Sequence, residues 1–69
     1  MGFMERMMAK GMIKTVRAGM QNASDQKLMS HVDTALQVIS NTDDIEVQGM
    51  LGELISDIRG ELRRRGMDF

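Results

Sequence analysis

Apolar residues between Thr42 and Gly66 recur at three- and four-residue steps, the spacing of one face of an α-helix. Acidic residues follow Thr42, which is the expected N-cap, and three arginines precede Gly66, which stands where a C′ glycine ends a helix. We therefore predict a helix over residues 43–65. Its apolar stripe consists of Val47, Met50, Leu51, Leu54, Ile55, Ile58 and Leu62.

The segment 3–20 also has a helical pattern, but its apolar arc covers more than half of the circumference. One row runs through Met4, Met8, Met12, Val16 and Met20, and Phe3, Met7, Ala9 and Ile13 widen it. A narrow basic stripe remains, formed by Arg6, Lys10, Lys14 and Arg17. Such a helix needs covering on more than one side, so we expect contacts beyond a single neighbour.

A third amphipathic pattern spans residues 24–40, after a break at residues 21–25 in which Asn22 or Ser24 is the expected N-cap. Its apolar positions are Leu28, Met29, Val32, Ala35, Leu36 and Ile39. Because both connections are short, the three helices should run up, down and up. The predicted fold is all-α: a small three-helix bundle with helices near 3–20, 24–40 and 43–65, forming one domain over residues 1–69.

Composition adds an expectation of self-association. A chain of 69 residues is near the lower size limit for independent folding, and it has no cysteine for a disulfide. Its core must be aliphatic and methionine, because two phenylalanines are its only aromatic residues. We expect a homodimer or a higher assembly in the cytoplasm.

Charge is distributed unevenly along the chain. Residues 1–22 hold four basic side chains against one acidic, whereas residues 43–62 hold six acidic against one basic. The basic first helix is therefore expected to pair with the acidic third, either within one chain or between two.

Small residues occupy the side of the third helix opposite its apolar stripe: Gly49, Gly52, Ser56 and Gly60. Glycine is costly inside a helix, and small residues four apart allow another backbone to approach closely. This face is either a docking surface or a set of exposed, tolerated glycines. We favour docking slightly.

Methionine is abundant, with nine in the chain. Flexible thioethers can repack against several partners, so we consider a partner-binding surface or a self-assembly core for Met4, Met7, Met8 and Met12. Met29 and Met50 are expected to fill the core. A Cu(I) site built from the early methionines is a weak alternative, because no cysteine or histidine accompanies them.

A rival function is electrostatic. The basic surface formed by Arg6, Lys10, Lys14, Arg17, Arg63, Arg64 and Arg65 could dock on nucleic acid or on an anionic membrane. No helix-turn-helix turn, zinc finger or aromatic platform supports sequence readout. The triple arginine is also explained as a helix end that complements the dipole.

Catalysis has the weakest support. His31 is the natural general acid or base, but it lies at the edge of an apolar stripe, as structural histidines often do. We expect no enzyme activity, no cofactor, no metal and no small-molecule substrate. The predicted function is a small regulatory protein–protein interaction module, an adaptor, inhibitor or assembly subunit that binds another protein or itself.

Overall fold

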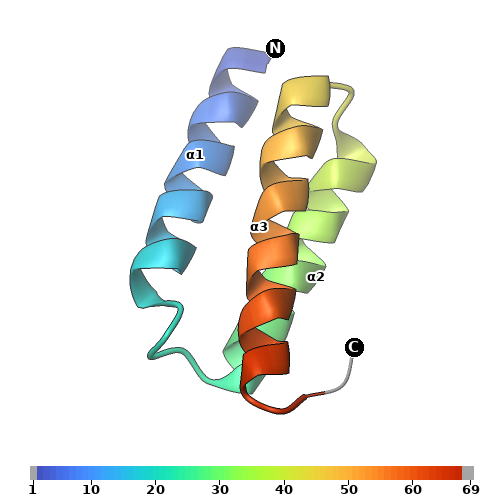
Figure 1. Ribbon diagram of the computed structural model, residues 1–69. Helices are drawn as coiled ribbons and strands as arrows, with labels where there is room; N and C mark the ends of the chain where they lie inside the picture. Colours follow the sequence, from blue (N-terminus) through green and yellow to red (C-terminus); the bar gives the residue numbers. More distant parts are fainter. Residues whose placement is uncertain (1, 68–69) are drawn as a thin grey trace.

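The computed structural model describes the backbone of residues 2–67 and the side chains of residues 4–67. Within that part of the chain there are three helices and no strand: α1 (Gly2–Gly19), α2 (Asp25–Asn41) and α3 (Ile45–Arg64). The helices run up, down and up, with α1 and α2 on different sides of α3 (Figure 1). The predicted all-α fold is confirmed, and the helix bounds differ from the predicted ones by one or two residues. The side chain of Phe3 lies outside the described residues.

The third helix supplies most of the core. Its buried side chains are Val47, Leu51, Leu54, Ile55, Ile58 and Leu62. Both other helices pack against α3 but hardly contact each other. Each contributes two buried residues, Ala9 and Val16 from α1 and Leu28 and Ala35 from α2. The apolar stripe predicted for α3 is confirmed, with Met50 half-buried at its edge.

The start of α3 differs from the prediction. Asp44, not Thr42, is the N-cap: its Oδ1 accepts hydrogen bonds from the backbone N–H groups of Glu46 (2.9 Å) and Val47 (3.4 Å). Thr42 instead ends α2 with an extended backbone, and its hydroxyl accepts from the N–H of Asp44 at 3.1 Å. Thr42 is buried at this corner, so it belongs to the connection and not to the helix. At α2, Ser24 is the N-cap and accepts from the N–H of Lys27.

The end of α3 is as predicted. Gly66 has a φ of 96°, which favours glycine because a Cβ would be strained there. Its N–H donates to the carbonyl of Arg63 at 2.9 Å, and the N–H of Met67 donates to the carbonyl of Leu62 at 3.0 Å. These two bonds form a Schellman motif that satisfies carbonyls at the helix end.

Two apolar side chains of α2 are less buried than predicted. Met29 and Leu36 are each 44% exposed. Both lie beside Arg59 and Leu62 of α3, along the outer side of the α2–α3 contact. No other helix of the described chain covers these two side chains, so the predicted core role of Met29 is wrong for the single chain.

Candidate interaction surface

The side of α1 that faces away from α3 is uncharged over most of its length. We define the outer face of α1 as the exposed residues Met4, Met7, Met8, Gly11, Thr15 and Ala18. At 100° per residue these positions share one side of the helix. Its first half is large and apolar, with Met4 69%, Met7 59% and Met8 74% exposed, whereas its second half is small. Exposed methionines in such a cluster are typical of adaptable contact surfaces.

A groove follows the seam between α1 and α2, because these two helices pack on α3 and hardly on each other. Its upper hollow, of about 390 Å³, has Leu51 of α3 among its lining residues, with Met8 and Met12 of α1 on one side and Val38 of α2 on the other. A lower hollow of about 520 Å³ continues the seam; its lining includes Thr15, Val16, Gly19, Lys27, Leu28 and His31. We call the two hollows together the α1–α2 groove.

The two ends of this groove carry opposite charge. Among the residues that line the upper hollow, Glu5 alone is charged. Among those that line the lower hollow, the charged residue is Lys27, and the half-buried His31 lies beside it. Between them the lining is apolar or uncharged. The groove therefore suits a helix whose apolar side faces α3 and whose charges lie at its ends.

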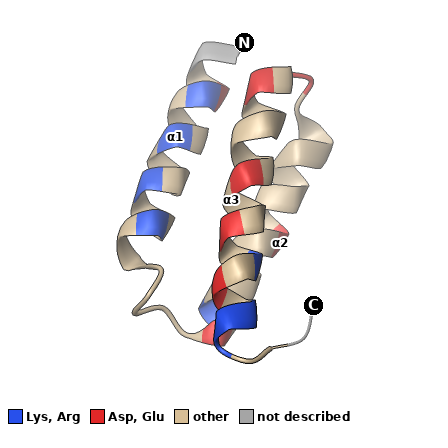
Figure 2. Ribbon diagram, in the orientation of Figure 1, with Lys and Arg blue, Asp and Glu red and all other residues tan. Residues whose placement is uncertain are grey.

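The basic stripe of α1 lies beside the acidic residues of α3 within one chain (Figure 2). Arg6 Nε is 2.9 Å from Asp44 Oδ2, and Arg17 Nη2 is 2.8 Å from Asp57 Oδ2. Lys10 and Lys14 line a hollow with Glu53. The predicted pairing of the two helices is thus intramolecular. These pairs orient α1 more than they stabilise it, because exposed ion pairs contribute little.

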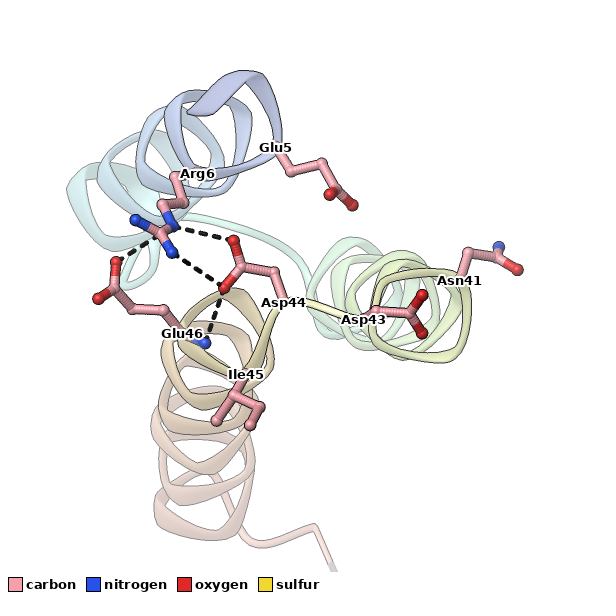
Figure 3. A pocket seen from close by; sticks show the side chains of 7 residues that line it. All are labelled: Glu5, Arg6, Asn41, Asp43, Asp44, Ile45 and Glu46. Carbon is pink, nitrogen blue, oxygen red and sulfur yellow. Dashed lines mark hydrogen bonds and ion pairs between the residues drawn. The ribbon is translucent and has the colours of Figure 1, made fainter. Parts of the chain in front are cut away.

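A polar cleft opens at the end of the molecule where α1 and α3 begin (Figure 3). Arg6 points across it to the Asp44 carboxylate and to Glu46 Oε2 at 3.3 Å, while Glu5 and Asp43 point away from this pair. The hydrogen bond from Arg6, with those from backbone N–H groups, holds the pKa of Asp44 below its ordinary value of 3.8. Arg6 therefore links the first turns of α1 and α3 through these ion pairs.

Arg65 ties the first connection to the end of α3. Its guanidinium donates to three loop carbonyls, those of Met20 (2.9 Å), Gln21 (3.3 Å) and Ala23 (2.8 Å). It also pairs with Asp25 at 2.8 Å and with Glu61 at 2.9 Å. The planar fork of arginine suits several acceptors at once. The residue was predicted to complement the helix dipole or to form part of a basic docking surface, so this anchoring role is a finding of the structure.

Acid should weaken the fold through two carboxylates. Hydrogen bonds from Arg64 and Arg65 lower the pKa of Glu61 from its ordinary 4.5, as Arg6 lowers that of Asp44. When the pH drops below the ordinary pKa values of these carboxyl groups, the unfolded chain binds more protons than the folded chain. The free energy of unfolding therefore decreases as the pH decreases. We expect the free energy of unfolding to be constant from neutral pH to about pH 5 and to decline below it.

Urea denaturation at a series of pH values measures this decline. The Asp44→Asn variant keeps the shape of the N-cap but loses one titrating group, so its decline should be shallower. An equal decline in the variant and the parent would show that Asp44 does not contribute.

The small-residue face of α3 is open to solvent. Gly49, Gly52 and Ser56 are exposed and Gly60 is half-buried. A Cβ added at any of the three glycines would meet no atom within 4 Å. Nothing in the single chain packs closely there, so docking at this face stays a prediction.

Alanine at position 52 should therefore stabilise the protein. The Gly52→Ala change removes backbone freedom from the unfolded chain without a clash, and we expect the free energy of unfolding to rise by about 0.5–1 kcal/mol. Urea denaturation measures the change, and Gly49→Ala is a second test on the same face. A loss of stability in both variants would reveal a contact that needs glycine.

Two further observations concern metal ligands and membrane spans. Within residues 2–67 no three histidine or carboxylate side chains are grouped so that they could hold a metal ion. Over the same residues, no helix combines the length and the apolar character needed to cross a bilayer.

The structure brings some predicted residues together and separates others. Met8 and Met12 line the α1–α2 groove, whereas the small residues of α3 lie on a different side of the molecule. The groove itself was missed, because it depends on how far apart α1 and α2 pack. The widely apolar pattern of residues 3–20 was the one signal for it. Comparison with known proteins found no matching family model, no similar curated protein and no similar solved structure.

Proposed function

We propose that this protein is a small non-enzymatic interaction module that binds another polypeptide chain through the outer face of α1 and the adjoining α1–α2 groove. One observation supports this above the others: three methionines of α1 are more than half exposed beside a groove that has Leu51 in its lining. An apolar surface of this kind excludes water when a second chain covers it, and burial then drives association.

The binding mode is an amphipathic helix laid in the groove. Such a helix places apolar side chains at steps of three and four residues against α3. Methionine rims adapt to the side chains that they meet, because the thioether chain is unbranched and flexible. The charged ends of the groove, Glu5 above and Lys27 below, would set the direction of the bound helix.

The rival electrostatic function has less support from the geometry. Arg6, Arg17 and Arg65 all pair with carboxylates of the same chain. A phosphate would have to compete with these partners. The apolar outer face of α1, by contrast, is exposed in the single chain.

A charge on the methionine face tests the proposal. Met8→Glu should weaken partner binding about tenfold or more, because association would bury an unpaired carboxylate. The fold should persist, since Met8 is 74% exposed. The measurement compares the host proteins retained by the immobilised parent and by the variant.

Ile45→Glu is the matched control, because Ile45 is 82% exposed and lies outside the groove. A protein retained by the parent and by this control, but not by Met8→Glu, is the expected result. If all three chains retain the same proteins, the α1 surface is not the binding site.

A further inference from the structure

We infer that the outer face of α1 pairs with the same face of a second copy, with the two helices antiparallel about a two-fold axis at Gly11. This inference rests on the proposed interaction surface and names the chain that covers it. It depends on two properties of the described residues, the order of large and small side chains and the placement of charge.

Side-chain size along the outer face is complementary to itself when one copy is turned end for end. Met4 and Ala18 both lie seven residues from Gly11, and Met7 and Thr15 both lie four residues from it. A two-fold axis at Gly11 therefore sets Met4 and Met7 level with small residues of the second copy, while Met8, three residues before Gly11, lies level with Lys14. Gly11 itself meets Gly11, and a Cβ there has nothing within 4 Å in the single chain. Two backbones can approach closely at such a point.

Charge selects the antiparallel arrangement. Glu5 is six residues before Gly11, so the axis places it at the level of residue 17 of the second copy. That level belongs to the lower hollow, where Lys27 lines the groove. The acidic end of each groove then meets the basic end of the other, twice by symmetry. A parallel pair would instead place Glu5 at the level of Glu5 and would not bring it to the level of Lys27, so it lacks this complementary pairing.

The remaining charges are compatible with this pairing. The outer face carries no charged residue from Met4 to Ala18, so no charge is buried at its centre. On the side away from α2, the axis brings together Lys10 and Lys14 of both copies. Glu53 lines the same hollow as these lysines and offsets part of their charge.

A contact built from one patch meeting itself is isologous and closes as a dimer. Both copies contribute the methionine half and the small half, so Met4 and Met7 of each copy lie level with small residues of the other. The second copy is thus the occupant that matches both the size and the charge of this surface.

Gly11→Leu is the primary test. In a dilute single chain this change should raise the melting temperature, because leucine is a better helix former and meets open space. In the dimer it overpacks the crossing point, so we expect the dissociation constant to rise about tenfold or more. Sedimentation equilibrium over a range of concentrations measures the mass. Opposite changes in stability and in association cannot come from misfolding.

Gly52→Leu is the matched variant on α3 and should leave the dissociation constant unchanged. Weaker association with Gly52→Leu and not with Gly11→Leu would place the contact on α3 and overturn the inference. A parent that has the mass of one chain at every concentration would also overturn it. The proposed function would still stand if Met8→Glu then lost a retained host protein, so the two failures are distinguishable.

Cysteine cross-linking tests the register, because the chain has no cysteine of its own. An oxidised mixture of Met4→Cys and Ala18→Cys should form a heterodimeric disulfide. Met4→Cys alone should not, because in the antiparallel pair its two copies lie about 21 Å apart along the helices, beyond disulfide reach. Efficient cross-linking of Met4→Cys to itself would show a parallel pair and overturn the inference.

Discussion

Replacing Leu54 with alanine should lower the free energy of unfolding by about 2–5 kcal/mol. Leu54 is fully buried in the core that α3 forms with both other helices. The truncation loses the transfer free energy of the removed methyl groups and leaves a cavity. Because a chain of this size has a total stability of roughly 3–10 kcal/mol, we expect a large part of the population to unfold.

Leu36→Ala is the matched control, since it makes the same chemical change in a helix at a position that is 44% exposed. Its cost should be about 1 kcal/mol or less. Urea denaturation at neutral pH gives both values. Equal costs at the two positions would mean that α3 does not form the centre of the core.

Loss of the Arg65 guanidinium should destabilise the protein more than the loss of any other arginine. The Arg65→Met variant keeps much of the apolar stem, but the carbonyls of Met20, Gln21 and Ala23 lose their donor. Glu61, whose side chain is 9% exposed, keeps only its pair with Arg64. Partly buried acceptors without a donor carry a desolvation cost, so the melting temperature should fall by several degrees.

Arg63→Met serves as the control, because Arg63 is exposed on the same turn of α3. Arg65→Lys separates charge from geometry: an ammonium group cannot reproduce the planar fork, so most of the loss should remain. Hydrogen exchange of the backbone amides in residues 20–25 should accelerate in both Arg65 variants. Exchange at the parent rate would contradict the anchoring role.

The buried face of α3 could be predicted from the sequence because the helical period of about 3.6 residues determines which residues share a face. Val47 to Leu62 follow that period without interruption, and all but Met50 are fully buried or nearly so. Gly66 could be predicted for a similar reason, since a helix end needs a residue that tolerates a positive φ.

Features that depend on residues far apart in the chain could not be predicted in this way. The hydrogen bonds of Arg65 to the loop carbonyls join positions 42 to 45 residues apart, and nothing local to the arginine run distinguishes Arg65 from Arg63. The N-cap of α3 is by contrast a local feature that was predicted two residues too early, at Thr42, although aspartate is at least as good an N-cap as threonine.

The candidate surface lies between these cases. The pattern of α1 indicated that its apolar arc was too wide for one neighbour. Which methionines face outward depends on where α3 lies, and this separates the exposed Met4 and Met7 from the half-buried Met12. The sequence alone assigned the same role to all of them.

The proposed interaction surface and the buried core consist of different residues in this small protein. The outward methionines of α1 form no part of the buried core, which rests mainly on α3. Mutations at Met4, Met7 or Met8 can therefore change what the protein associates with while its fold is inherited intact. Substitutions at the proposed surface could therefore accumulate in evolution while each variant still folds.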